Sequence, residues 1–440
     1  MKLANIYWMN TELSNKVKAV NLGDILQLEI IDNLYSQFFN TEKVVKLTTK
    51  EVSTYRGEKL ILPLNWSLFD SNYMDGKQIN ISQDIIPVFL AMTIETGSYK
   101  DEYINEYNID YLKKYEPIGC RDEKTRQMLI NNGIRAYLNG CLTITIKKQN
   151  KIGDKIIFVD VPIEVSKYLP KWEEKIEIFT QQQYFDENCS INQIREYVKS
   201  RYEYYFSEAK LIVTSRLHVA SPCRAAGIPV IFVKNVIDDR LPWLRIYTPL
   251  YNKTEYSSID WNPIQCDYEE KKQIILKNAV NRIRQAMGEK TNEDYTEQVD
   301  ELYDNLTGGQ SSFQSTVFNN FDKIIHFLNN KYQWEDEFEY AIWGAGQAAE
   351  NVYKYIQLKY KRAVLTSVID MYRRGNFHGR KIVSLEEYRR YKNEIMLVVP
   401  VQASNMAQPI LEQMGFTKSE YICAGELFIS SNDLIGKFSQ

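Results

Sequence analysis

The chain has 440 residues, which is more than one typical domain holds, so its length predicts two or three domains. Hydrophobic residues make up 44% and charged residues 25%, as in soluble globular proteins, and the net charge of −3 gives no reason to expect a nucleic-acid partner. The six cysteines form no CxxC pair and only three histidines are present, so we expect no metal site and a cytoplasmic protein with reduced thiols.

The first part of the chain alternates short apolar runs with helical patterns. Strands are predicted over residues 2–10, 58–65, 85–94, 117–121 and 134–146. Helices are predicted over residues 21–39, 98–115 and 123–132, the last one capped by Asp122 and ended by Gly133. This alternation predicts a parallel sheet with helices on both faces.

A second α/β unit follows the polar stretch at residues 147–155. Its predicted strands are 154–161, 172–182, 210–215 and 228–233. Its predicted helices are 190–209, 218–227, 268–290 and 293–306. The Gly/Ser-rich residues 307–316 predict a linker, and a third α/β unit begins near Phe338.

Arg216 and His218 lie where the predicted strand 210–215 ends and a helix begins. Ligands of open α/β sheets bind outside the carboxyl ends of strands, and a helix N-terminus offers free N–H groups to an anion. Arg216 adds a planar cation, and His218 adds a proton donor near neutral pH. From the residues alone two interpretations stay open: an anion site, or a surface arginine paired with a carboxylate beside a helix start.

Three sequence blocks occur in a fixed order: "NLGDILQLEI" from Asn21, "PIGCRDEKTRQMLINNGIRAYLNGC" from Pro117 and "TSRLHVASPCRAAGIPVIFV" from Thr214. With them the chain resembles, over roughly residues 1–305, the polysaccharide pyruvyl transferases, which move pyruvate from phosphoenolpyruvate to glycans. The resemblance implies two Rossmann-like domains facing a cleft, as in GT-B glycosyltransferases. It also implies a pyruvate ketal on a sugar of a cell-surface polysaccharide or of its lipid-linked precursor.

The resemblance further implies roles for individual residues. Phosphoenolpyruvate carries a carboxylate and a phosphate, so its site needs fixed cations. The residues expected to bind it are Arg216, Arg121, Ser215 and Leu217. His218 is the candidate acid, or else a phosphate ligand, and Asp24 is the candidate catalytic group at the acceptor hydroxyl, or else a helix cap. The residues expected at the acceptor are Asn21, Gly23, Asp239 and Arg240, although Asp239 and Arg240 also fit a solvated charged loop, beside Asp238 and Arg245.

The sequence departs from the family pattern at Leu142–Thr143, where Asp-Pro is usual, and around Leu62–Trp66, where a glycine-rich strand end is usual. These departures leave two other hypotheses open. One is a GT-B glycosyltransferase that uses a nucleotide sugar, and the other is a non-catalytic assembly or binding protein. Apart from phosphoenolpyruvate and a glycan acceptor, we expect no partner beyond peripheral attachment to the inner face of the membrane, because no apolar run approaches the length of a membrane span.

The third unit carries Gly344, Gly346 and Ala349 after a strand, in the GxGxxA pattern, and Asp370 at the end of the next strand. This pattern is typical of dinucleotide sites, in which the glycines approach a pyrophosphate and the acid binds ribose hydroxyls. It resembles small Rossmann-like modules attached to sugar-modifying enzymes. Nucleotide binding and a purely structural or interaction role both remain open, and no cofactor is needed for the expected transfer.

The expected organisation is therefore α/β throughout. Its parts are an N-terminal Rossmann-like domain on the acceptor side (1–148), a second on the donor side (149–306), a linker and connecting helix (307–336) and a small C-terminal Rossmann-like domain (337–440).

Overall fold

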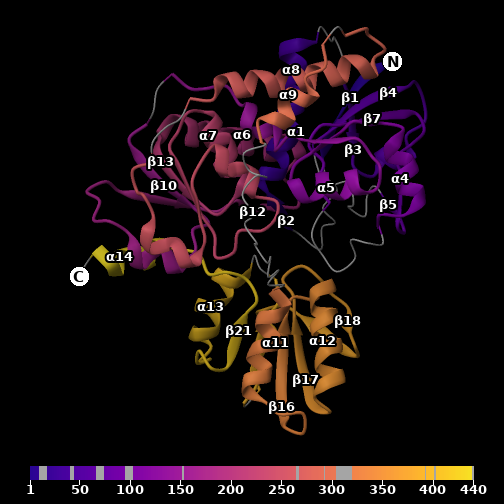
Figure 1. Cartoon of the computed structure of the whole chain (residues 1–440). Helices are drawn as coiled ribbons and strands as arrows, with labels where there is room; N and C mark the ends of the chain where they lie inside the picture. The colour runs from indigo at the N-terminus through magenta and orange to yellow at the C-terminus, as the bar shows by residue number, and fades with distance from the viewer. Residues whose placement is uncertain are drawn as a thin grey trace.

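The structure is a computed structural model. It describes residues 1–8, 17–39, 44–65, 74–94, 103–150, 153–263, 267–291, 293–303, 320–391, 393–400 and 403–438. Three main sheets, built mostly of parallel strands and covered by helices, confirm the predicted α/β class (Figure 1). The predicted linker at 307–316 and Trp66 of the family departure lie outside the described residues.

The first sheet has the strand order β3 (Val45–Thr48), β1 (Lys2–Trp8), β4 (Leu60–Leu64) and β7 (Ile85–Phe89), all parallel. A parallel bridge between Met92 and Cys120 links it to the pair β8 (Ile118–Cys120) and β9 (Ala136–Leu138). The smaller elements around it are α2 (Glu51–Thr54), the hairpin β5 (Met74–Asp75) and β6 (Gln78–Ile79), α4 (Glu106–Lys113) and α5 (Glu123–Asn131).

Two predictions about this sheet have different outcomes. Asp122 caps α5 as predicted, because its side chain accepts a hydrogen bond from the N–H of Thr125. The predicted strand over 134–146 is wrong in its second half. The strand ends at Leu138, Gly140 turns the chain at a φ of +67°, and a 3-10 helix, η2 (Leu142–Thr145), follows.

The second sheet has the strand order β11 (Ile176–Phe179), β10 (Lys155–Val159), β13 (Ala209–Thr214), β14 (Val230–Val233) and β15 (Leu250–Tyr251), all parallel. The long helix α6 (Ile191–Glu208) and the short helix α7 (Leu217–Ala225) flank β13 in sequence. The short 3-10 helices of this part are η3 (Ile163–Tyr168), η4 (Pro242–Ile246) and η5 (Lys253–Ser258).

The first two sheets are joined by more than a linker. Strand β2 (Val17–Asn21) pairs antiparallel with β12 (Gln182–Asp186), so that α1 (Leu22–Phe38) begins beside the second unit. One hydrophobic core runs from Leu3 to Tyr303 through both units. Helix α8 (Glu269–Ala286) contacts β4 and β7, and α9 (Thr296–Glu301) contacts β9, although both helices fall in the range expected for the second domain.

The third sheet has the order β18 (Asn376–Phe377), β19 (Arg380–Val383), β17 (Arg362–Ile369), β16 (Glu337–Trp343), β20 (Ile395–Val398) and β21 (Tyr421–Cys423), parallel except for the β18–β19 pair. Helices α11 (Asn320–Lys331) and α12 (Gln347–Lys359) cover one face, and α13 (Ser404–Gln413) covers the other.

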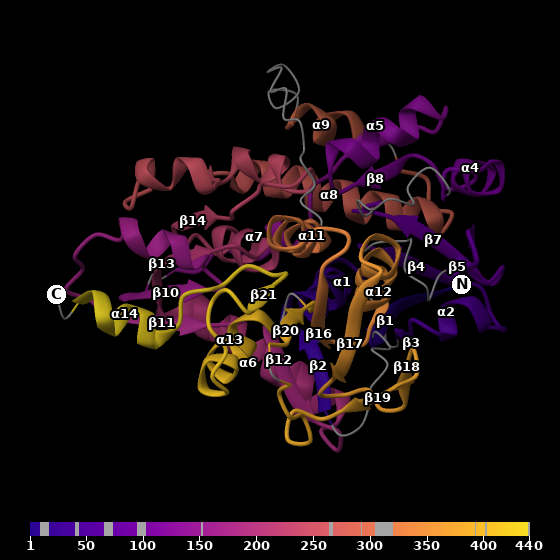
Figure 2. The ribbon, with the colours of Figure 1, turned by 90° about the horizontal axis from the view of Figure 1, so that it is seen from below.

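The end of the chain leaves this third unit. Beyond β21 it returns to the second sheet and forms α14 (Ser431–Phe438), which Figure 2 shows beside β11, on the side of the molecule that carries β10 in Figure 1. Ile429 and Leu434 are buried in the core of that sheet, together with Ile156 and Phe158 of β10. Among the described residues, no helix has the length and apolar character needed to cross a bilayer.

Candidate active site

A cavity of about 280 Å³ lies where the two first units meet, and Arg216 forms part of its wall. We call it the Arg216 cavity. It is lined by Asn21, Asp24, Gln27, Arg121, Gln181, Ser215, Arg216, Leu217, His218, Lys234, Asp238, Arg240 and Leu241. These side chains come from the starts of α1 and α7 and from loops that follow β8, β11 and β14.

The start of α1 is fixed by Asn21 and by the second unit. The Asn21 Oδ1 atom accepts a hydrogen bond from the N–H of Gly23 at 3.1 Å, and its Nδ2 atom donates to Asp24 Oδ1 at 3.0 Å. The N–H of Leu22 donates to the carbonyl of Gln181 at 3.0 Å. Asn21 is therefore the helix cap, and the alternative that Asp24 is the cap is wrong because Asp24 lies within the first turn.

Gly23 allows the start of α1 to pack close to α7. A β-carbon at this position would lie 2.5 Å from Cβ of His218, which is closer than real side chains pack. Gly23 was expected to contact the acceptor, and the contact that its lack of a side chain permits here is with His218.

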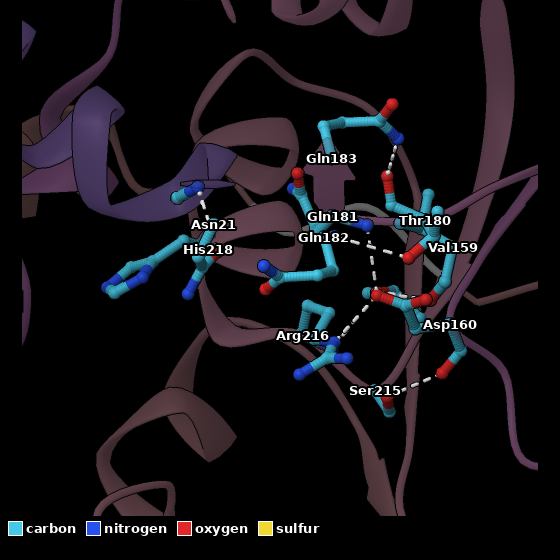
Figure 3. Close-up of polar contacts among 12 residues, drawn as sticks. Asn21, Val159, Asp160, Thr180, Gln181, Gln182, Gln183, Ser215, Arg216 and His218 are labelled. Atoms are coloured by element: carbon cyan, nitrogen blue, oxygen red, sulfur yellow. Dashed lines mark hydrogen bonds and ion pairs between the residues drawn. The ribbon is translucent and has the colours of Figure 1, made fainter. Parts of the chain in front are cut away.

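His218 lies buried between α1 and α7. Its backbone carbonyl accepts a hydrogen bond from the Tyr202 hydroxyl at 2.6 Å, and its Nε2 atom is buried with no hydrogen-bond partner among the described residues. Burial, reinforced by the guanidinium groups of Arg121 and Arg240, holds the pKa of His218 well below its usual value of 6.5. The imidazole is therefore neutral at pH 7 unless an anion binds beside it. In Figure 3 its ring points away from Arg216.

Arg216 is held by a carboxylate that the sequence prediction did not include. Its Nε atom donates to Asp160 Oδ2 at 2.7 Å, and the same oxygen accepts from the N–H of Gln181 at 3.0 Å (Figure 3). The Ser215 hydroxyl donates to the Asp160 carbonyl. Asp160 follows β10 and Arg216 follows β13, and these strands are neighbours, so the ends of two parallel strands supply the pair. The terminal nitrogens of Arg216 have no partner among the described residues.

Several other polar groups around the cavity, mostly donors, lack partners among the described residues. Arg216 precedes α7 without capping it through its side chain, and the N–H groups of Leu217 and His218 have no hydrogen-bond partner in the described parts of the chain. The buried side-chain atoms without a partner include Gln27 Nε2, Arg121 Nε, Gln181 Oε1 and His218 Nε2. Buried polar groups are normally satisfied, so this concentration around one cavity indicates a ligand site.

The charge of the cavity wall is mainly positive. Arg121 is buried, and its Nη2 atom donates to Gln27 Oε1 at 2.6 Å and to the carbonyl of Asn65 at 2.9 Å. In the loop after β14, Asp238 binds both Lys234 and Arg240. Burial alone would raise the pKa of Asp238, but these two cations lower it below its ordinary value. Four permanent cations thus face two aspartates, which suits an anionic ligand.

The structure brings together eight of the ten residues expected at the donor, the acceptor and the catalytic step. They are Asn21, Asp24, Arg121, Ser215, Arg216, Leu217, His218 and Arg240. Gly23 lies behind His218, and Asp239 pairs with Lys124 of α5 at 2.5 Å outside the lining. Sequence reasoning missed Asp160, Gln27, Gln181 and Lys234 as site residues. Lys234 directly follows a predicted strand, which is the signal that could have found it, whereas Asp160 follows β10 but lies inside the predicted strand 154–161.

In the third unit, the carboxylate of Asp370, which was expected to bind a ribose, accepts hydrogen bonds from backbone N–H groups. Its Oδ2 atom accepts from the N–H of Ala345 at 2.8 Å, and its Oδ1 atom accepts from the N–H groups of Tyr372 and Arg373, both at 2.8 Å. Gly344 adopts a φ of +102° and packs on Pro400, while Gly346 begins α12. These contacts give Gly344, Gly346 and Asp370 of the GxGxxA pattern a structural role that needs no nucleotide. Nucleotide binding there stays a prediction.

The Arg216 cavity lies largely within a region that matches a known family. Residues 21–235 match the model of the polysaccharide pyruvyl transferase family. The predicted resemblance is therefore confirmed over residues 21–235, and the matched region contains ten of the thirteen residues that line the cavity, from Asn21 to Lys234. Only the residues contributed by the end of the loop, Asp238, Arg240 and Leu241, follow the matched range.

Other comparisons add little to this match. No curated protein matches the sequence. A solved structure of a functionally uncharacterized protein from Klebsiella pneumoniae subsp. pneumoniae NTUH-K2044 is similar, with 16% identity and a TM-score of 0.35, over 57% of this chain and 92% of that one.

Proposed function

We propose that the protein transfers a pyruvyl group from phosphoenolpyruvate to a sugar of a cell-surface polysaccharide or of its lipid-linked precursor and forms a pyruvate ketal. The family match supports the transfer of pyruvate to a polysaccharide. The observation that carries the choice of donor is the Arg216 cavity, where arginines from three loops surround the uncapped start of α7. A small ligand with two anionic groups suits such a wall.

The two anionic groups of the donor have separate partners in this proposal. The unpartnered N–H groups at the start of α7 and the terminal nitrogens of Arg216 hold the phosphate, as helix starts and arginines commonly do. Arg121 holds the carboxylate through its free Nε atom. Arg240, beside His218, adds positive potential.

The chemistry balances with the groups present. A proton adds to the terminal enol carbon of phosphoenolpyruvate, and an acceptor hydroxyl oxygen bonds to the central carbon. The bond from that carbon to the phosphate oxygen breaks, inorganic phosphate leaves, and a second acceptor hydroxyl bonds to the same carbon to close the ketal. One of the two hydroxyl protons replaces the proton added to the enol carbon, and the other protonates the departing phosphate.

His218 and Asp24 are the proposed acid and base. His218 is neutral in the empty cavity, and the negative charge of bound phosphoenolpyruvate raises its pKa so that it can carry the proton for the enol carbon. Asp24, oriented by Asn21, takes the proton of the attacking hydroxyl. Both side chains line the same cavity, at the starts of two helices that meet at Gly23.

A GT-B-like pair of Rossmann-like domains is the arrangement we propose for this catalyst. It is supported by the parallel sheets and by the way Arg121, Ser215 and Lys234 follow the carboxyl ends of β8, β13 and β14. One hydrophobic core runs through both units and joins them closely.

The test is calorimetric titration with phosphoenolpyruvate, with uridine and guanosine diphosphates titrated in parallel. We expect phosphoenolpyruvate to bind, and Arg216→Ala to weaken it by about tenfold to a hundredfold, the value of a hydrogen bond to a charged group. Arg135→Ala is the matched control, because Arg135 is an exposed arginine paired with Glu116 outside the cavity. Binding of the nucleotides without phosphoenolpyruvate would overturn the donor and favour a glycosyltransferase. Release of phosphate with formation of an acid-labile ketal on a glycan would then establish the reaction.

A further inference from the structure

A second cavity, of about 640 Å³, lies between the second sheet and the segment that returns from the third unit. We call it the interface cavity. It is lined by Asp160, Lys175, Ile176, Glu177, Ile178, Phe179, Thr180, Gln182, Tyr184 and Arg216 on one side and by Asn405, Met406, Phe428, Ile429, Ser430 and Ser431 on the other. The family match ends at residue 235, so the second set of residues lies beyond it.

The contacts that build this cavity are specific. Phe428 forms a β-bridge with Pro162, and backbone hydrogen bonds of 2.7 Å join Ile163 to Leu427 and Ile429 to Val161. The Asn405 side chain holds the backbone of Phe428 from both sides, donating to its carbonyl and accepting from its N–H, each at 2.7 Å. The third unit therefore supplies a fixed wall rather than a loose cover.

Arg216 separates the interface cavity from the Arg216 cavity and lines both. The ring of Phe428 lies 5.3 Å from its guanidinium carbon, on a side chain whose Nε atom is bound to Asp160. A ligand in the interface cavity thus lies next to the donor side of the site, one side chain away.

The interface cavity combines apolar surfaces with polar groups that have no partner. Ile176, Ile178 and Met406 contribute apolar surface, and Tyr184, whose ring stacks on that of Tyr372, is 43% exposed. The amide of Gln182, the hydroxyl of Ser431 and the amine of Lys175 have no hydrogen-bond or ion-pair partner within the described part of the chain. A pyranose ring needs this combination, because it presents C–H faces for apolar side chains and hydroxyl groups for donors and acceptors.

The same residues disfavour a phosphorylated ligand. The start of α14 is occupied by Asp433, whose Oδ2 atom accepts from both the N–H and the hydroxyl of Ser430, at 2.7 and 2.6 Å. The lining holds as many carboxylates, those of Asp160 and Glu177, as cations, those of Lys175 and Arg216, and the proposed function assigns Arg216 to the donor phosphate. Neutral hydroxyl groups suit this wall better than phosphates.

We propose that the interface cavity holds the saccharide acceptor, with the third unit as part of the acceptor site. This assignment rests on the proposed function, which places the donor on the other side of Arg216. It moves the saccharide ring from the predicted acceptor residues Asn21, Gly23, Asp239 and Arg240 to a cavity that Met406, Phe428 and Ser431 help to form, and the reacting hydroxyls extend past Arg216 toward Asp24.

The test fills the cavity without touching the donor residues. Met406→Trp places a large ring inside it, and Ser431→Trp, at an exposed position on its rim, does the same from outside and is the variant less able to disturb folding. Leu358→Trp is the matched control, because Leu358 is 86% exposed on α12. Saturation-transfer NMR with methyl glycosides of glucose, galactose, mannose and N-acetylglucosamine measures saccharide binding, and calorimetry with phosphoenolpyruvate measures donor binding.

We expect at least one glycoside to receive saturation from the wild-type protein and from Leu358→Trp, and both cavity variants to lose that signal while phosphoenolpyruvate affinity stays unchanged. Retained glycoside binding in Ser431→Trp and Met406→Trp would overturn the assignment, as would the absence of any glycoside signal from a wild-type protein that binds phosphoenolpyruvate. Glycoside binding that both variants abolish, in a protein that does not bind phosphoenolpyruvate, would support the saccharide cavity and overturn the donor instead.

Discussion

The Nε atom of Arg216 lies 2.7 Å from Oδ2 of Asp160, and the two residues follow neighbouring parallel strands. The Asp160 side chain is only 3% exposed, so water competes little for this contact. Asp160 thereby fixes one edge of the guanidinium and leaves the other available to a ligand. Because Arg216 lines both the Arg216 cavity and the interface cavity, this pair sets the position of the side chain that both cavities share.

Asp160→Ala is expected to destabilise the protein by about 2–4 kcal/mol, because it leaves two donors without an acceptor and puts alanine at a positive φ. The backbone of Asp160 has a φ of 48°, which asparagine tolerates better than alanine, so Asp160→Asn should cost less. Urea unfolding measures the difference. Asp154→Ala, at an exposed position just before the same strand, is the control and should unfold like the wild type. A wild-type midpoint for Asp160→Ala would contradict the anchoring role of this carboxylate.

Ligands of open α/β sheets bind at the carboxyl ends of the strands, and this rule accounts for most of what the sequence predicted about the site. Arg121 and Ser215 are the last residues of predicted strands and Arg216 follows one, and parallel strands bring their carboxyl ends to one edge. The rule does not say which strands are neighbours. Asp160 therefore could not be matched with Arg216 from the sequence, although it follows "KIIFV" directly.

The errors have local physical causes. Within the loop after β14, Asp238 faces Lys234 and Arg240 while the next residue, Asp239, faces α5, and no sequence pattern distinguishes two adjacent aspartates in a loop. The docking of Phe428 onto Arg216 joins residues 212 positions apart and leaves no periodic signal. The packing role of Gly23 depends on the approach of α1 to α7, which arises from tertiary packing and from the β2–β12 pairing rather than from a local sequence pattern.

Binding of phosphoenolpyruvate is expected to be accompanied by proton uptake near neutral pH. Burial and the nearby cations Arg121 and Arg240 keep His218 neutral in the empty cavity, because they disfavour its protonated form. A bound anion stabilises the protonated form and so raises the pKa of His218. Calorimetric titrations in buffers of different ionisation enthalpy measure the number of protons taken up. His218→Asn should bind with less uptake, and the remainder then belongs to the phosphate itself. Equal uptake by both proteins would remove His218 as the proton donor.

The same low pKa predicts a loss of stability on mild acidification. Protonation of His218 is suppressed in the folded state, so below pH 6.5 the unfolded chain binds more protons at this residue, and stability falls as the pH falls. For one such histidine, the loss between pH 7.5 and 5.5 is about 1.4 kcal/mol. Urea unfolding of the wild type and of His218→Asn at the two pH values isolates this contribution from the carboxylates. An identical pH dependence of the two proteins would show that the imidazole titrates normally.

Gly23→Ala is expected to reduce activity more than stability. The new methyl group would lie 2.5 Å from Cβ of His218, so the start of α1 or α7 must move. Overpacking of this kind costs about 1–3 kcal/mol. The shift falls on His218 and on the N–H groups that face the cavity. We therefore expect the turnover number to fall by more than the loss of folded protein can explain. Ser36→Ala, at an exposed position of the same helix, is the matched control. Normal turnover in Gly23→Ala would show that the spacing of the two helices is not part of catalysis.

Asp370→Ala tests whether the third unit uses its glycine-rich turn for structure or for a nucleotide. The carboxylate accepts hydrogen bonds from three backbone N–H groups, of Ala345, Tyr372 and Arg373, so we expect its loss to destabilise the third unit by about 2–4 kcal/mol. Hydrogen exchange measured by mass spectrometry should show faster exchange in β16 and β17, and Glu386→Ala, an exposed carboxylate in the same unit, should leave exchange unchanged. If Asp370 binds a ribose instead, we expect unchanged hydrogen exchange in the variant. The protection from exchange that added NAD⁺ gives to the wild type would then be lost in the variant. That result would contradict the structural role of Asp370 and restore the nucleotide interpretation of the GxGxxA pattern.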